Sequence, residues 1–225
     1  MSGASAQVVR LDARAAFFCA LLPVGFIYVA VVLCHRANPF ASRNDPWGDW
    51  LGVTLSGPAL FLLAAQHVLP AIRPLRSLLM HGAVYVLAFF AGLHWEYIGQ
   101  YSGANFSLTS RQLSHLKTAD VTMLIVGAVV FIGMTAICVR AAYRTRILGR
   151  YLAAFAGLIL GLVVVTALLG PAYHVHIHHY FWALCLAPFV RFPNPACLVM
   201  QAFLVGTYVE GASRWGFGAI WNPGS

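Results

Sequence analysis

The residues Tyr151–Gly170 read YLAAFAGLILGLVVVTALLG, and after Pro171 the chain continues from His174 to Tyr180 as HVHIHHY. The first part carries no charge, and an apolar run of about 20 residues is long enough to cross the hydrocarbon core of a bilayer as a helix. Four of the nine histidines follow at the end of that run. The stretch therefore predicts a spanning helix that leads directly into a polar, histidine-rich segment.

The composition of the whole chain also indicates that most of it lies in a lipid bilayer. Of 225 residues, 60% are hydrophobic and only 9% are charged, and the mean hydropathy is +0.78. A water-soluble domain of this length cannot bury so much apolar surface. We therefore predict one integral membrane domain, residues 1–225, in contact with the lipid bilayer. The five cysteines include no CxxC pair and are interpreted as small apolar residues of helices.

Apolar runs along the chain predict an all-α, polytopic transmembrane helix bundle of about seven spans, with six also possible. The predicted runs are Ala15–Cys34, Asp49–Ile72, Ser77–Ile98, Ala119–Val139, Tyr151–Gly170, Tyr180–Val190 and Ala196–Gly211. Residues 56–58, Ser-Gly-Pro, predict a kink in the second run. The sixth run is short and reaches membrane length only if it begins near His174, so the histidines are expected in its first turns. The last two runs form either full spans or a re-entrant pair.

The basic residues orient this bundle. The net charge is +8, but the arginines lie in short gaps between apolar runs and not in one patch, which argues against nucleic-acid binding. With seven spans, nine of the 14 basic residues fall on one side, and the largest group, four arginines, lies between Arg140 and Arg150. The positive-inside rule then places the N-terminus on the cytosolic-type side and the C-terminus opposite.

The clustered histidines have spacings that suit a metal ion. On a helix, His174 and His178 lie one turn apart on one face, while His176 and His179 lie three apart on another. Either pair can offer imidazole nitrogens to Zn, Cu or Fe, and a further ligand is needed. The groups expected on the same side of the membrane are His94, Glu96, His115, Asp120 and Glu210. The predicted ligand set is His174, His176, His178, His179, His94 and Glu210.

Other roles for these side chains remain open. The histidines could hydrogen-bond lipid headgroups and water at the interface, or relay protons. Glu210 lies four residues before Arg214, which also suits an ion pair within one helix. His94 and Glu96 are about 200° apart around a helix, so they can face one ion only if the helix has ended by then.

A resemblance covers about a fifth of the chain. From His176 the sequence runs HIHHYFWALCLAP, then RF, a proline-rich break, QAFLVG and YVEGASRWGFGAI. This pattern resembles the C-terminal membrane segment of LCCL-domain-containing membrane proteins of fungi and protists. The resemblance rests on His176, His178, His179, Tyr180, Pro188, Gln201, Gly206 and the stretch Gly211–Gly216. It implies a membrane architecture and no particular chemistry.

Two further interpretations, a zinc hydrolase and a haem protein, match only some of the residues that each would need. Ser77 and His81, with His174 and His178, match parts of the zinc site of alkaline-ceramidase-like hydrolases, but the predicted topology puts the two pairs on opposite sides of the bilayer. His81 and His94 on one helix could suggest a pair of haems, but their separation of 13 residues turns them about 140° apart.

We therefore expect a polytopic membrane protein with a non-cytosolic-side, histidine-rich site for a transition metal. The alternative is a non-catalytic accessory or structural subunit of a larger membrane complex, held to other membrane subunits by its polar and aromatic side chains. The sequence contains no nucleophile–base pair at a usable spacing, so enzymatic activity stays undecided.

Overall fold

The computed structural model describes residues 12–34, 46–69, 75–96, 118–170, 172–175, 177–218 and 220–223. Almost all of these residues are helical, as expected, and two three-residue strands add a short ribbon that the all-α prediction omitted. Five helical segments are long and apolar enough to cross a membrane: Ala13–Leu33, Trp47–Val68, Ile125–Arg144, Leu148–Leu169 and Pro195–Trp215. The chain is thus compatible with an integral membrane protein, and the count of seven spans stays a prediction.

The first two spans each contain a proline and a wider helical turn. Helix α1 (Ala13–Tyr28) continues as a π-helical turn, η1 (Val29–Leu33), and α2 (Pro46–Leu60) continues as η3 (Phe61–Ala65) and α3 (Gln66–Val68). Proline removes a backbone donor and displaces the preceding turn of a helix. The π-helical turn η3 follows Pro58 by three residues, and the kink expected at residues 56–58 stays a prediction.

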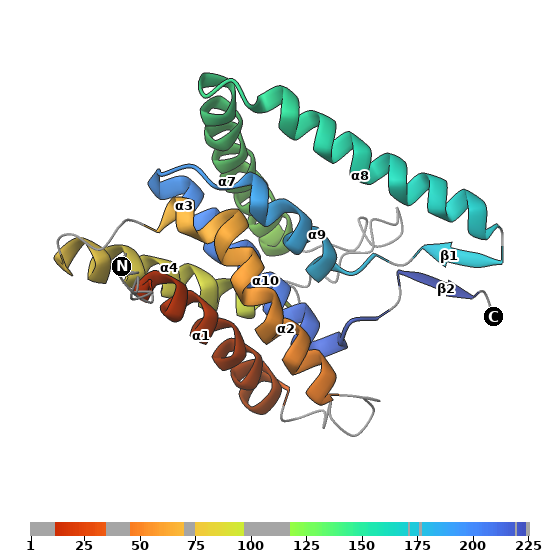
Figure 1. The fold of residues 1–225 in the computed structure, drawn as a ribbon, viewed down its shortest axis with the longest axis horizontal. Helices are drawn as coiled ribbons and strands as arrows, with labels where there is room; N and C mark the ends of the chain where they lie inside the picture. The colour runs from red at the N-terminus through yellow and green to blue at the C-terminus, as the bar shows by residue number, and fades with distance from the viewer. Residues whose placement is uncertain are drawn as a thin grey trace, which may run out of the picture.

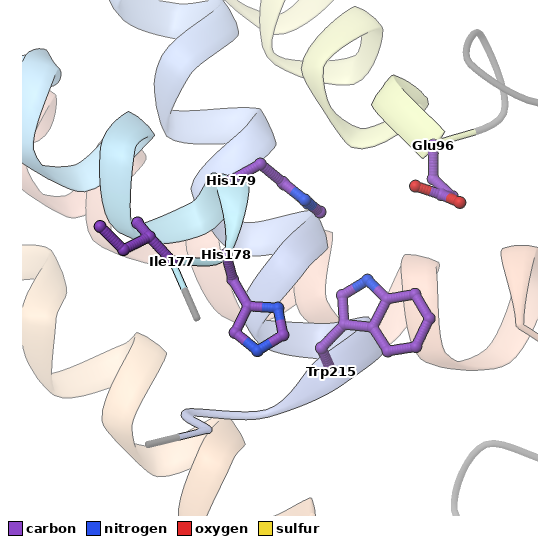
Figure 2. A pocket seen from close by; sticks show the side chains of 5 residues that line it. All are labelled: Glu96, Ile177, His178, His179 and Trp215. Carbon is purple, nitrogen blue, oxygen red and sulfur yellow. The ribbon is translucent and has the colours of Figure 1, made fainter. Parts of the chain in front are cut away.

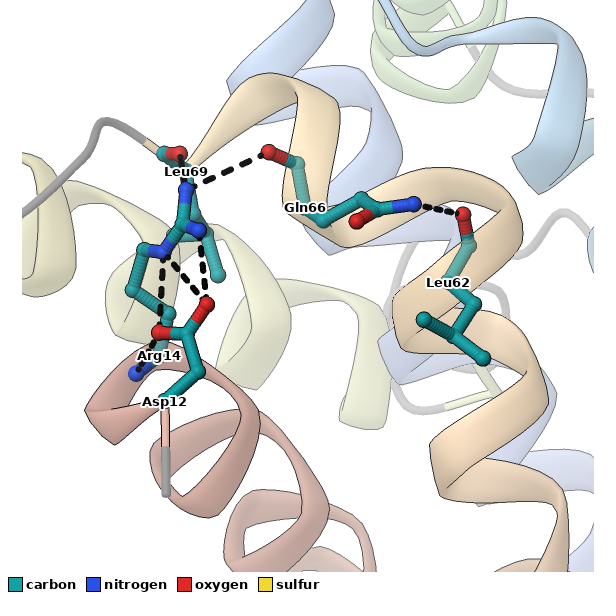
Figure 3. A network of polar contacts seen from close by, with 5 residues as sticks. All are labelled: Asp12, Arg14, Leu62, Gln66 and Leu69. Carbon is teal, nitrogen blue, oxygen red and sulfur yellow. Dashed lines mark hydrogen bonds and ion pairs between the residues drawn. The ribbon is translucent and has the colours of Figure 1, made fainter. Parts of the chain in front are cut away.

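Arg14 holds these two segments together at one end. Its Nη1 donates to the carbonyl oxygens of Gln66 and Leu69, at 3.5 and 3.2 Å, while its Nη2 pairs with the Asp12 carboxylate at 2.6 Å (Figure 3). The last carbonyls of a helix have no partner within that helix, so a cation placed there satisfies them. The Gln66 side chain bonds the Leu62 carbonyl in the same way, one turn back.

Three longer helices follow along the chain. Helix α4 spans Leu75–Leu93, α7 spans Thr118–Arg144, and α8 spans Leu148–Leu169. Arg146, at a φ of 57°, makes the tight turn between α7 and α8, and Gly170, at a φ of 76°, ends α8. Figure 1 shows α8 running along one side of the molecule, away from α1, α2 and α4.

The predicted sixth span is wrong at its beginning. Strand β1 (Tyr173–Val175) pairs antiparallel with β2 (Trp221–Pro223), with His174 opposite Asn222. Helix α9 begins only at His179 and ends at Leu186, followed by a 3-10 turn, η4 (Ala187–Phe189). The alternation of Tyr, His and Val favours a strand when a partner strand is present. The histidines are therefore not in the first turns of a long helix.

Helix α10 (Pro195–Trp215) is the centre of the molecule. Asn194 begins it by accepting a hydrogen bond from the Cys197 amide at 2.9 Å, and Gly216, at a φ of 72°, ends it. Gly206 of α10 and Gly92 of α4 face each other so closely that a Cβ on either would collide with the other helix's backbone. Small residues allow such close backbone packing between membrane helices.

Candidate functional site

A buried acid joins two of the predicted site residues at the C-terminal end of α10. The Glu210 side chain is completely buried, its Oε2 accepts from Nε2 of His179 at 2.8 Å, and its Oε1 accepts from Nε of Arg214 at 2.6 Å. Arg214 and Glu210 form the i,i+4 ion pair that the sequence suggested. His179 comes from the first turn of α9, so the site joins two helices that run side by side.

The electrostatics of this cluster explain why an acid is tolerated inside the bundle. A buried carboxylate is costly unless charge and hydrogen bonds compensate it. Here both oxygens are bonded, and the guanidinium of Arg214 supplies the opposite charge. Because Nε2 of His179 donates to Glu210, Nδ1 is the ring nitrogen that remains for a further partner.

Gly211 makes room for this contact. A Cβ at Gly211 would lie 2.7 Å from Cβ of Tyr180 and 2.8 Å from Nε2 of His179, so any larger residue would push α9 away from α10. The glycine therefore brings His179 within reach of Glu210. Its place directly after Glu210 was the signal in the sequence that could have identified the pair.

An open recess of about 320 Å³ lies beside the buried pair. It is lined by Glu96, Ile177, His178, His179 and Trp215 (Figure 2). In Figure 2, His179 and Glu96 lie on different sides of this space, and the rings of His178 and Trp215 lie below them in the view. The recess thus combines two neighbouring imidazoles, His178 and His179, with the carboxylate of Glu96 from a second segment of the chain.

A second acid, which the sequence reasoning missed, fixes the end of α10. Oδ1 of Asp49, in the first turn of α2, accepts from the Phe217 amide at 3.0 Å, and a Cβ at Gly216 would collide with that carboxylate. The Tyr180 hydroxyl donates to the Gly218 carbonyl at 3.0 Å. These bonds position the segment that follows Trp215 against both α2 and α9.

His94 does not line the recess. Its Nδ1 donates to the Phe90 carbonyl at 2.8 Å, and its Nε2 accepts from the Tyr28 hydroxyl at 3.2 Å. The contact with Tyr28 holds this end of α4 against α1, whereas the bond to Phe90 stays within the α4 segment. Glu96, two residues later, lines the recess instead, so the two side chains do not meet at one site.

The structure places the other predicted ligands as follows. His174 belongs to β1, so the helical spacing between His174 and His178 is not realised. His176 and His115 lie outside the described residues, as do the side chains of His174 and Asp120. Within the part of the chain that is described, no three His, Cys, Asp or Glu side chains are close enough together to hold a metal ion.

The remaining contacts join segments that the sequence assigned to the same side of the membrane, and the sides themselves stay a prediction. Arg14 bonds Leu69, and Arg191 bonds Tyr151 at 2.7 Å. All four residues lie at or next to connections between spans that were assigned to one side of the membrane. Asp49 bonds Phe217, and His179 bonds Glu210. These four residues lie near connections that were assigned to the opposite side.

Comparisons of the chain with models of protein families, with curated proteins and with solved structures find no match.

Proposed function

We propose that the chain is a polytopic membrane protein that binds a transition metal ion, such as Zn, Cu or Fe, in the recess at the end of α10. His178 and His179 are the first ligands in this proposal. The observation that supports it best is the bond between Glu210 and His179. Metal-binding histidines usually donate their second ring nitrogen to a carboxylate or carbonyl, which fixes the ring and strengthens the ligand.

Glu210 was expected to be a metal ligand, and in this proposal it positions one instead. Its two oxygens already bond His179 and Arg214, so it orients a ligand and is not itself one. Nδ1 of His179 then faces the ion. The carboxylate of Glu96 supplies an oxygen ligand from across the recess, or His176, the neighbour of Ile177, supplies a third imidazole. Either addition requires the ligands to draw closer together when the ion binds.

Elemental analysis of the purified, full-length protein tests the proposal. The protein is dialysed against Zn²⁺, freed of excess metal and compared with His176→Ala/His178→Ala/His179→Ala. The wild type should retain a stoichiometric amount of zinc, and the triple variant almost none. The matched control is His67→Ala/His81→Ala, which also removes imidazoles but far from the recess, and it should bind zinc as the wild type does. Absence of zinc from the wild type would remove the proposal.

A second function, an accessory subunit of a membrane complex, is favoured by a different observation. No residue of the span Leu148–Leu169 is buried within the chain, and only 11% of an 18-residue stretch of Ile125–Arg144 is buried. Such helices contact lipid or another membrane protein. Crosslinking in native membranes, followed by mass analysis, distinguishes the two: a defined second polypeptide joined to α8 supports the subunit function, whereas a chain that stays monomeric opposes it.

A further inference from the structure

Two cysteines from distant parts of the chain meet at the other end of α10. Cys138 lies in the second half of α7 and Cys197 in the first turn of α10, 59 positions apart in sequence. Their sulfur atoms are 2.9 Å apart, and both side chains are buried. A disulfide S–S bond is about 2.05 Å long, so a movement of about 1 Å brings the two sulfurs to bonding distance.

The surroundings of Cys197 favour its reactivity. Nδ2 of Asn194 donates to the Cys197 sulfur at 3.2 Å, and the Cys197 amide donates back to Asn194 at 2.9 Å. The residue also lies in the first turn of α10, where the helix dipole favours negative charge. A thiol beside a helix N-terminus and a hydrogen-bond donor is a better nucleophile than an ordinary buried thiol.

The pair lies where the outer helices join the core. Among the side chains of α7 that are described, the buried ones are Cys138 and Ala142, one turn apart. Nearby, Nε of Arg191 donates to the Tyr151 hydroxyl of α8 at 2.7 Å. A covalent bond between Cys138 and Cys197 would therefore connect the α7–α8 hairpin to the central helix at the point where they already touch.

We propose that Cys138 and Cys197 form a reversible disulfide when the protein meets a hydroperoxide. The Cys197 thiol gives up its proton and the resulting thiolate attacks one oxygen of the peroxide. The O–O bond breaks, the leaving oxygen takes up a proton, and a sulfenic acid and one molecule of water or alcohol result. The Cys138 sulfur then attacks the sulfenic sulfur, its proton leaves with the hydroxide as water, and the S–S bond forms. Both sulfurs are oxidised by one electron each, and the peroxide takes up the two electrons.

The arginines nearby suggest when the bond would form. Arg140, Arg144, Arg146 and Arg150 flank the α7–α8 turn and predict that this end faces the cytosol. Thiols of a cytosolic-type compartment are kept reduced, and disulfides there are transient and responsive to oxidants. The resting state is accordingly the dithiol that the structure contains.

Mass spectrometry of the full-length protein in lipid nanodiscs tests this inference. Samples treated with hydrogen peroxide and untreated samples are alkylated, digested and mapped. The expected product is a peptide pair joined through Cys138 and Cys197, lighter by two hydrogen atoms, which dithiothreitol separates again. Cys185→Ser, which removes a half-buried thiol elsewhere, should form the same bond, and Cys138→Ala should not.

Mapping of the wild type decides the matter even if Cys138→Ala does not fold. If both thiols remain alkylatable after peroxide, the inference is overturned. The same conclusion follows if Cys197 is oxidised without joining Cys138, or if either cysteine pairs with Cys19, Cys34 or Cys185.

Discussion

Helices α8 and α10 are of similar length, yet the molecule uses them in opposite ways. Of an 18-residue apolar stretch of α10, 83% of the residues are buried inside the chain, whereas the share in α8 is 0%. The more apolar of the two, α8, is the exposed one. Lipid is as apolar as a leucine side chain, so apolarity does not draw a membrane helix inward. Polar side chains do, because at membrane depth they need partners that only protein can provide.

The buried polar groups of α10 illustrate this rule. Gln201 accepts from the Tyr85 hydroxyl of α4 at 2.6 Å, and Ser213 donates to the Phe26 carbonyl of α1 at 3.0 Å. Glu210 binds Arg214 and His179. Each of these bonds joins α10 to a different neighbour or to itself, and together they give the central helix its place.

Among the substitutions that test the contrast between α8 and α10, Glu210→Ala is expected to lower stability most. The substitution leaves the Arg214 guanidinium without its buried partner, so the free energy of unfolding should fall by about 3–5 kcal/mol. Reversible denaturation in mixed micelles measures the change. Arg150→Ala, on the exposed first turn of α8, should alter stability by less than about 0.5 kcal/mol. Equal losses in the two variants would contradict the assignment of inner and outer helices.

The same substitution at two glycines sharpens the comparison. Gly206→Ala puts a methyl group against the backbone of α4, where neither helix can yield, and should cost about 1–3 kcal/mol. Gly161→Ala in α8 meets nothing within 4 Å, so it should leave stability unchanged or raise it by up to about 1 kcal/mol through helix propensity. Thermal unfolding of both variants in one detergent provides the test, and a destabilised Gly161→Ala would indicate that α8 is packed after all.

Much of this arrangement could be predicted from the sequence, and the limits have physical causes. Run length predicted the first span as Ala15–Cys34, and the helix found is Ala13–Leu33. Periodicity cannot distinguish an inner from an outer apolar helix. It also could not place His174 in a strand, because the partner strand Trp221–Pro223 lies far along the chain.

The candidate site was predictable in part. Its two members His179 and Glu210 were assigned to one side of the membrane, and they do bond each other. His94 was assigned to the same side but turns toward Tyr28, a difference of helical phase that depends on where α4 ends. Asp49 gave no signal, because its partner is a backbone amide that becomes available only where α10 ends at Gly216.

A smaller effect is expected from the hydrogen bond that fixes α10 to α4. Tyr85→Phe removes the donor to the buried Gln201 oxygen and should lower the free energy of unfolding by about 1–2 kcal/mol. Tyr143→Phe removes a hydroxyl from an exposed ring of α7 and should change little. Chemical denaturation of the two variants side by side checks this. A neutral Tyr85→Phe would mean that Gln201 finds another donor.

The smallest expected effect on stability comes from the ion pair between Asp12 and Arg14 at one end of the bundle, and it depends on pH. The hydrogen bonds from Arg14 hold the pKa of Asp12 below its ordinary value. The stability gained is present above the unfolded pKa, about 3.9, and is lost as the pH falls through the lowered folded value. Asp12 is 36% exposed, so the gain is below about 1 kcal/mol. Asp12→Asn should flatten the acid limb of the stability profile between about pH 2 and pH 5, and an unchanged limb would exclude this pair as its source.

Photolabelling from within the bilayer tests the contrast between α8 and α10 most directly. Purified, monodisperse protein in lipid vesicles is irradiated with a lipid-soluble carbene precursor, which inserts into any side chain that touches lipid, and the labelled peptides are mapped. Peptides from Leu148–Leu169 should carry many times the label found in residues 198–213. Labelling of residues 198–213 at or above the level of α8 would contradict the placement of α10 at the centre.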